Sequence, residues 1–301
     1  MRVIGVAVAL LFVASACANG SDGERQARAR GGPAQTPTVT ITPTPSPEPT
    51  RPHGFRFAVI GDSGTGLEGQ HEVARRMCRW RRDHPYNLIF TTGDNIYPDG
   101  SREYFDSAFF EPYSCLLENG ARFRAALGNH DIVTEEGRPE LEEPAFGLKA
   151  RNYVVRKGSV RIVVVNSNAL DRGRLRRALK TEPGERWTVV VMHHPIYSSG
   201  EHGSTPGFGD LPAMFRRKGV DLVLSGHDHN YEVTRPLRRI RYVVTGGGGA
   251  SLRPCTPQWF SERCIVRHHF LYVTAGKERI RVKAIPPQGR VMDRFTTTGR
   301  R

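Results

Sequence analysis

The chain has 301 residues, with 44 Lys and Arg against 30 Asp and Glu, which gives a formal net charge of +14. This length fits one large domain or two small ones. The positive charge is compatible with binding to a nucleic acid, an anionic membrane surface or small anionic substrates, although solvated arginine-rich faces are more common. Because no aromatic residues interleave with the basic runs, specific nucleic-acid binding is not expected.

The first residues have the pattern of an export signal. Arg2 precedes an apolar segment, 3–16, that is too short to span a bilayer of roughly 30 Å as a helix. This pattern predicts a signal peptide over residues 1–16. Its last residues are small and precede Cys17, so they resemble a bacterial lipobox and also suit an ordinary signal peptidase. We expect an exported protein of a bacterial cell envelope, either secreted or attached to the membrane only through a lipid on Cys17.

Residues 17–53 have the composition of a linker. They are rich in Gly, Ser, Thr, Arg and Pro and hold almost nothing to bury, which predicts an extended, disordered spacer. Residues 54–301 show no repeat and no second linker. The sequence therefore predicts one catalytic domain behind a flexible spacer.

The cysteines beyond Cys17 are even in number. This is compatible with two disulfides in an oxidising compartment. We expect Cys255 and Cys264 to close a small loop, which leaves Cys78 to pair with Cys115. Four free buried thiols are the alternative.

Several apolar runs end abruptly in a turn that carries acidic, amide or histidine side chains. Short β-branched runs bounded by glycine predict buried strands, and segments 70–82, 172–180 and 211–218 predict helices. Strands that alternate with helices predict an α/β fold, whose ligands gather beyond the carboxyl ends of the strands. The runs are FRFAVI before Gly61-Asp62, NLIFTT before Gly93-Asp94, FRAAL before Gly128-Asn129-His130, WTVVVM before His193, and VDLVLS before Gly226-His227-Asp228-His229.

The side chains at these strand ends form a candidate metal-binding set. One polar residue after a strand is usually a helix cap or a turn former. Five strand ends that each carry oxygen or imidazole donors indicate a shared site. Oxygen and imidazole donors without a thiolate suit iron, zinc or manganese better than calcium or a cysteine-rich zinc site. The number of donors favours two adjacent metals. The candidates are Asp62, Asp94, Asn129, His193, His227 and His229.

The blocks GD, GD, GNH, H and GHxH occur in the order found in the calcineurin-like metallophosphoesterases, which this sequence resembles from about residue 56 to 244. The usual first block in that superfamily is Asp-x-His, whereas Gly64 is the second residue after Asp62 here. The block GDNIY places Tyr97 three residues after Asp94, supplies the replacement ligand and is typical of the purple acid phosphatases. GNHD, HHPIYSSGEHG and GHDHN are similar to their small, mammalian-type branch.

This resemblance implies a four-layer αββα fold, a β-sandwich flanked by helices, and a role for each motif residue. It implies that His130 and His202 face the substrate, where an imidazole can bind a phosphate oxygen or protonate the departing alcohol. The alternative for His130 is to orient a ligand, and His194 and Asp228 are expected to be structural. The implied metal ligands are Asp62, Tyr97 and His229 for a ferric ion, Asn129, His193 and His227 for a divalent iron, zinc or manganese, and Asp94 as the bridge between the two.

The resemblance predicts an exported acid phosphatase that hydrolyses small phosphate monoesters by direct attack of metal-bound hydroxide. A phosphodiesterase or nucleotidase on the same metal centre is the alternative among enzymes. A non-catalytic envelope binding protein is the alternative of another class, and we would expect such a protein to have lost ligands. The sequence carries no signal for an oligomeric state.

Overall fold

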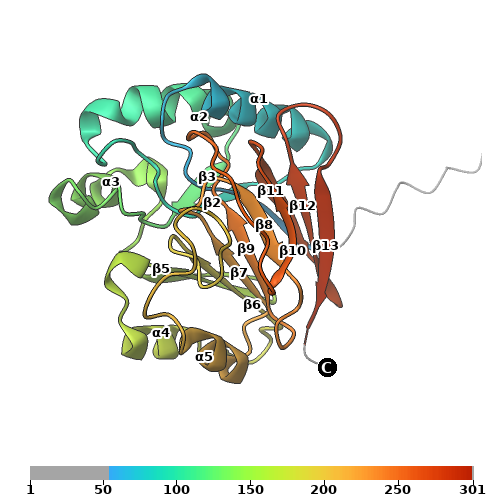
Figure 1. Ribbon diagram of the computed structural model, residues 1–301. Helices are drawn as coiled ribbons and strands as arrows, with labels where there is room; N and C mark the ends of the chain where they lie inside the picture. Colours follow the sequence, from blue (N-terminus) through green and yellow to red (C-terminus); the bar gives the residue numbers. More distant parts are fainter. Residues whose placement is uncertain (1–53, 300–301) are drawn as a thin grey trace, which may run out of the picture. The chain divides into compact units, whose positions relative to one another are not determined.

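The computed structural model describes residues 54–299, in which two mixed β-sheets pack face to face between two helical layers (Figure 1). The first sheet has the strand order β13-β12-β11-β1-β2-β3. Because β1, β2 and β3 run parallel, their carboxyl ends lie at one edge of the sheet. The strands of this sheet are β1 (Phe55–Ile60), β2 (Leu88–Thr91), β3 (Arg122–Ala125), β11 (Phe270–Ala275), β12 (Arg279–Ile285) and β13 (Asp293–Thr298).

The second sheet has the strand order β10-β8-β9-β7-β6-β5-β4. Its strands β5, β6, β7 and β9 run parallel, so their carboxyl ends also share one edge. The strands are β4 (Tyr153–Lys157), β5 (Val160–Val165), β6 (Trp187–Met192), β7 (Leu222–Ser225), β8 (Tyr231–Thr234), β9 (Arg241–Thr245) and β10 (Ser261–Ile265).

Helices cover the outer face of each sheet and are visible above and below the strands in Figure 1. The residues of α1 and α2 form a hydrophobic core with the outer face of the first sheet, and those of α4 and α5 form one with the second. The helices are α1 (Glu68–Asp83), α2 (Glu111–Glu118), α3 (Arg138–Glu142), α4 (Arg172–Ala178) and α5 (Leu211–Lys218), with short turns η1 (Arg102–Tyr104), η2 (Asp106–Phe110), η3 (Glu135–Gly137), η4 (Pro144–Phe146) and η5 (Ser167–Ala169).

The central strands are mostly apolar because both of their faces are buried. In β1, Phe57 and Val59 point into the core between the sheets, whereas Ala58 and Ile60 point into the core beneath α1 and α2. The predicted αββα layers are therefore confirmed. The runs FRFAVI, NLIFTT, FRAAL, WTVVVM and VDLVLS overlap β1, β2, β3, β6 and β7, and the predicted helices correspond to α1, α4 and α5.

The two expected disulfides are both present. Cys78 in α1 is bonded to Cys115 in α2, with Cα atoms 6.4 Å apart, and this bond ties together two helices of one layer. Cys255 is bonded to Cys264 in β10, with Cα atoms 6.5 Å apart. This second bond closes the loop that follows β9, near the edge where the parallel strands end.

The predicted signal peptide (1–16), the candidate lipid site at Cys17 and the spacer (17–53) lie outside the described residues and stay predictions. Within residues 54–299, no helix has both the length and the apolar character needed to cross a bilayer.

Removal of the two disulfides is expected to have unequal costs. Loop-closure entropy predicts that the free energy of unfolding falls by about 4 kcal/mol without the bond that spans 37 residues, and by about 3 kcal/mol without the bond that spans 9. Urea denaturation of Cys78→Ser/Cys115→Ser and Cys255→Ser/Cys264→Ser variants measures both values. A larger loss from the shorter loop would contradict the entropic account.

Candidate metal centre

The predicted ligands converge where the carboxyl ends of the two sheets meet. The turns after β1, β2 and β3 supply residues from the first sheet, and the turns after β6 and β7 supply residues from the second. These turns are distant in sequence, and the face-to-face packing of the sheets brings them together. In chain order, the residues are Asp62, Asp94, Tyr97, Asn129, His193, His227 and His229.

Some of these residues have a backbone conformation that side chains rarely adopt. The φ angle is 55° at Asp62, 52° at Asp94 and 73° at His227. A non-glycine residue in this left-handed region is strained, and the surrounding structure must hold it in place. Close packing does so, because a side chain on Gly128 would overlap the Asp94 carboxylate and one on Gly226 would overlap that of Asp62. These glycines allow the carboxylates to lie directly against the neighbouring backbone.

Asp94 faces both halves of the site. Its Oδ2 accepts a hydrogen bond from the Tyr97 hydroxyl at 2.9 Å, and that hydroxyl lies 3.2 Å from Nε2 of His229. Its Oδ1 lies 3.5 Å from Nε2 of His193 and accepts a hydrogen bond from the His130 backbone N–H at 3.0 Å. Each carboxylate oxygen thus points to a different group of predicted ligands, so Asp94 lies between the two groups.

His193 lies at the centre of the second group. Its Nδ1 is 3.0 Å from the carbonyl oxygen of Thr92, which can accept the ring N–H on that side. Its Nε2 is 2.9 Å from Oδ1 of Asn129 and 3.2 Å from Nδ1 of His227. A carbonyl that holds the outer nitrogen leaves the lone pair of the inner nitrogen free for a metal. Three donor atoms therefore converge at this point.

His229 is oriented in the same way in the first group. Its Nδ1 lies 2.9 Å from the carbonyl oxygen of Ser251, and its Nε2 lies 3.6 Å from Oδ1 of Asp62. The Asp62 carboxylate also accepts hydrogen bonds from the backbone N–H of His227, at 2.9 and 3.1 Å. The turns after β1 and β7 are joined by these contacts.

The electrostatics of the site favour a cation. Burial and the neighbouring Asp94 carboxylate raise the pKa of Asp62 well above its usual range. Burial, then the nearby histidines, lower the pKa of His227 to about 2. Burial and the two carboxylates raise the pKa of Tyr97 strongly. Buried carboxylates, imidazoles and a phenol within reach of one another are a donor set that fits metal ions. The ligand atoms of Asp62, Asp94 and His193 all lie within 4.8 Å of one another.

His194 lies closer to the site than the sequence indicated. Its Nδ1 is 2.9 Å from the Ser167 hydroxyl, and burial lowers its pKa to about 4. Its ring centroid is 4.6 Å from that of His227, and the ligand atoms of His193, His194 and His227 lie within 4.8 Å of one another. The expected packing role agrees with these contacts, and the structure adds that this packing is against a predicted metal ligand.

The two histidines expected to face the substrate lie beside predicted ligands. The ring centroid of His130 is 4.4 Å from that of Tyr97, and its Nδ1 lies 2.6 Å from the carbonyl oxygen of Pro98. The ring of His202 is exposed and stacks on His227, with centroids 4.3 Å apart. Both rings therefore lie at the solvent side of the predicted metal ligands.

Two further residues hold the His202 turn in place. Asp228 is fully buried and accepts hydrogen bonds from the His202 backbone N–H, at 2.8 Å, and from the Ser198 hydroxyl. These contacts are those of the structural carboxylate that the sequence predicted. Arg253 was not predicted: its guanidinium contacts Nε2 of His202, and its backbone N–H donates to the His229 carbonyl at 3.1 Å.

Comparisons with known proteins agree with this arrangement. Residues 55–231 match the calcineurin-like phosphoesterase family. Purple acid phosphatase 4 of Arabidopsis thaliana is 28% identical over 234 residues, which cover 65% of this chain and 69% of that protein. Tartrate-resistant acid phosphatase type 5 of Mus musculus is 24% identical and covers 64% and 72% of the two chains. The structure of purple acid phosphatase PPD1 from yellow lupin seeds superimposes with a TM-score of 0.69 at 19% identity, over 84% of this chain and 55% of that one.

The chain belongs to the calcineurin-like phosphoesterase family. Its similarity to purple acid phosphatases confirms the resemblance inferred from the sequence, and together these findings define a metal-dependent phosphatase. Such enzymes have a dinuclear metal centre, and the buried aspartates and histidines described above fit it.

We predict that Asp94→Ala disables both metal sites. A bridging carboxylate offsets the repulsion between two cations, so its loss should reduce metal content and phosphatase activity together. Because even outer-shell substitutions cost about 10–100-fold, the activity should fall by more than about a hundredfold. Metal analysis and activity assays, with Asp83→Ala at the exposed end of α1 as control, measure both. Full metal content with near-normal turnover would exclude a bridging role.

The three histidines near β6 should respond differently to substitution. His193→Ala should lose the divalent metal. His202→Ala should keep both metals and lose about 10²–10⁴-fold in rate, as expected for a proton donor. His194→Ala should have little effect on either. Metal content and catalytic rate should be measured for each variant. The assigned roles are wrong if His202→Ala loses metal or if a folded His194→Ala protein is inactive.

Proposed function

We propose that the chain is an exported acid phosphatase that hydrolyses phosphate monoesters with a ferric ion and a divalent iron, zinc or manganese ion. The proposal rests on one difference from the usual metallophosphoesterase pattern. The ligand usual at position 64 is missing, and Tyr97 supplies the replacement. A side chain at Gly64 would run into the backbone of Asn95, so no ligand can occupy that position. The Gly64 carbonyl instead accepts a hydrogen bond from the Tyr97 N–H at 2.8 Å, which holds Tyr97 beside Asp94.

The metals would be held by the two groups of donors on either side of Asp94. Asp62, Tyr97 and His229 form the group proposed for the ferric ion. A trivalent ion beside a divalent one would acidify bound water and supply the nucleophile at mildly acid pH, with charge stabilisation for the phosphoryl oxygens. Burial and the nearby carboxylates raise the pKa of Tyr97, and a cation beside its hydroxyl would favour the ionised form.

The residues at the solvent side would bind and orient the ester. His130 and His202 can donate to a phosphate oxygen or to the departing alkoxide, and Arg253 adds a positive charge beside His202. A groove of about 420 Å³ begins at Tyr97 and His229 and is also lined by Arg253. The exposed side chain of Leu67 lines the same groove, which offers an apolar surface to the alcohol part of the substrate.

Export is supported by the two disulfides, because such bonds persist in oxidising compartments. A binding protein without catalytic activity would not need to keep every metal ligand. In this chain, all the metal-ligand positions of the family are filled. A panel of phosphate mono- and diesters, assayed with purified metal-loaded protein, separates the monoesterase from a phosphodiesterase or nucleotidase. Preferential hydrolysis of diesters would overturn the monoester assignment.

The role of Tyr97 gives a spectroscopic prediction. A phenolate bound to ferric iron should give the purified protein a visible charge-transfer colour, and hydrolysis should be fastest below neutral pH. Tyr97→Phe should remove the colour and leave the fold, measured by circular dichroism, unchanged. A colourless wild-type protein with two divalent metals and an alkaline optimum would contradict the ferric site.

A further inference from the structure

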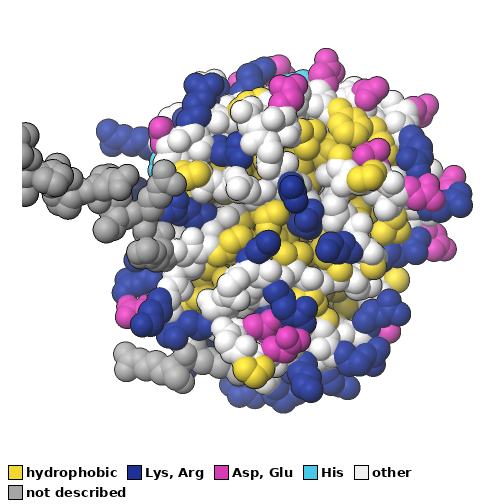
Figure 2. Space-filling view, turned by 180° about the vertical axis from the view of Figure 1, so that it is seen from behind, with side chains coloured by type: hydrophobic (Ala, Val, Ile, Leu, Met, Phe, Trp, Pro, Cys, Tyr) yellow, Lys and Arg dark blue, Asp and Glu magenta, His cyan; other side chains and the backbone are white. Residues whose placement is uncertain are grey.

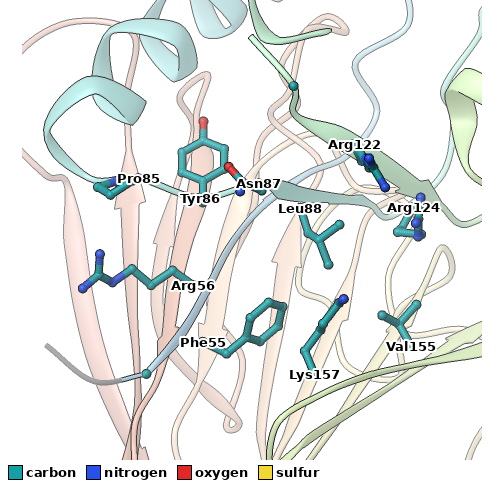
Figure 3. Close-up of a pocket in the computed structure, with 12 residues that line it drawn as sticks. Phe55, Arg56, Pro85, Tyr86, Asn87, Leu88, Arg122, Arg124, Val155 and Lys157 are labelled. Atoms are coloured by element: carbon teal, nitrogen blue, oxygen red, sulfur yellow. The ribbon is translucent and has the colours of Figure 1, made fainter. Parts of the chain in front are cut away.

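Two hollows in the domain are lined by several basic residues. The hollows have volumes of about 560 and about 660 Å³, and Gly54, Phe55 and Lys157 line both. Neither is lined by Asp or Glu. Figure 3 shows the first hollow, with Arg122, Arg124 and Lys157 grouped beside Phe55 and Leu88. The basic residues of the two linings are Arg56, Arg122, Arg124, Lys157, Arg186 and Lys277, and we call them the basic edge.

The basic edge lies at the opposite end of the sheets from the candidate metal centre. Arg56 is at the start of β1, Arg122 is at the start of β3, and Arg186 directly precedes β6. The predicted metal ligands follow the other ends of these strands. Since a strand rises about 3.3 Å per residue, the length of β1 separates the two regions by roughly 20 Å. A ligand at the basic edge would therefore leave the candidate metal centre accessible.

Several cations of the basic edge have no partner in the described part of the chain. The side chains of Arg122, Lys157, Arg186 and Lys277 are exposed and form neither an ion pair nor a side-chain hydrogen bond within residues 54–299. Some arginines elsewhere on the surface are paired instead: Arg172, for example, binds Asp210 at 2.8 Å. Clustered unpaired cations repel one another and create a positive potential that attracts anions.

We propose that the basic edge docks on the anionic phosphate headgroups of a phospholipid bilayer. The chain enters the domain at this edge, because Gly54, which lines both hollows, follows directly on the predicted spacer. A membrane presents many fixed phosphates, which match cations spread over the ends of two sheets. Basic side chains also border apolar surface near the middle of the face seen in Figure 2. Docking here would turn the candidate metal centre away from the membrane.

Vesicle co-sedimentation tests the proposal without the contribution of a lipid anchor. The chain from Ala18 onward keeps the whole described domain and lacks Cys17. It should bind vesicles of phosphatidylcholine containing phosphatidylglycerol, and should dissociate in about 0.5 M salt, where the screening length is only a few ångströms. Charge reversal of the edge, Arg122→Glu/Lys157→Glu/Lys277→Glu, should weaken binding more than tenfold. The control, Arg176→Glu/Arg177→Glu/Lys180→Glu at the exposed end of α4 and just beyond it, changes the net charge equally and should bind like the wild type.

Each outcome decides the proposal. Tight binding by the wild type and the control, with loss in the edge variant at unchanged phosphatase activity, supports it. Equal loss in both variants would assign the effect to net charge alone and overturn it. The proposal would also be overturned if the wild-type protein did not bind anionic vesicles, or if it bound polyphosphate or RNA but not lipid. Because vesicle binding is measured apart from catalysis, a failure of the proposed phosphatase function would not produce these results.

Discussion

The burial of two carboxylates in one place is the constraint on which this structure depends. Asp62 and Asp94 end neighbouring parallel strands, are almost inaccessible to solvent and raise each other's energy when ionised. A protein can keep two buried carboxylates ionised only if cations or donors compensate them. Here the compensation must come from the facing sheet and the turns around it, which bring imidazoles and a phenol to the same place. The positive φ angles of both aspartates show that the backbone is held against its own preference to do so.

The two sheets divide the work of the site. The first sheet supplies the carboxylates, the phenol and the amide, and the second supplies the histidines at the ends of β6 and β7. The connection between β9 and β10 places Arg253 beside His202, and Cys255, which is bonded to Cys264, pairs with Gly200 near the turn that carries His202. The disulfide thus ties to β10 the segment that follows Arg253, a residue that lines the groove beside the predicted ferric ligands. The basic edge lies at the opposite ends of the same two sheets. The basic edge and the candidate metal centre therefore share one fold but no residue.

Much of the site was predictable because its residues follow strand ends that are visible as glycine-bounded apolar runs. The place of Tyr97 beside Asp94 was also predictable, since Gly64 and Tyr97 each lie within a short motif, GDSG and GDNIY, that the sequence shows directly. Arg253 was not, because its contact with His202 crosses 51 residues and depends on how the loop after β9 folds. The strands β12 and β13 were not predicted, although exposed Arg279 and Arg281 alternate with buried Ile280 and Val282, which is the period-two pattern of a strand with one buried face. The proximity of His194 to His227 likewise appears only when β6 and β7 are placed side by side.

The central claim is that two metal ions are held on either side of the Asp94 carboxylate. Anomalous X-ray diffraction from crystals of the metal-loaded protein tests it most directly, at wavelengths that distinguish iron from zinc and manganese. The account predicts two anomalous peaks, with iron at Asp62, Tyr97 and His229 and a second metal at Asn129, His193 and His227. A single peak, or metal bound away from Asp94, would contradict it.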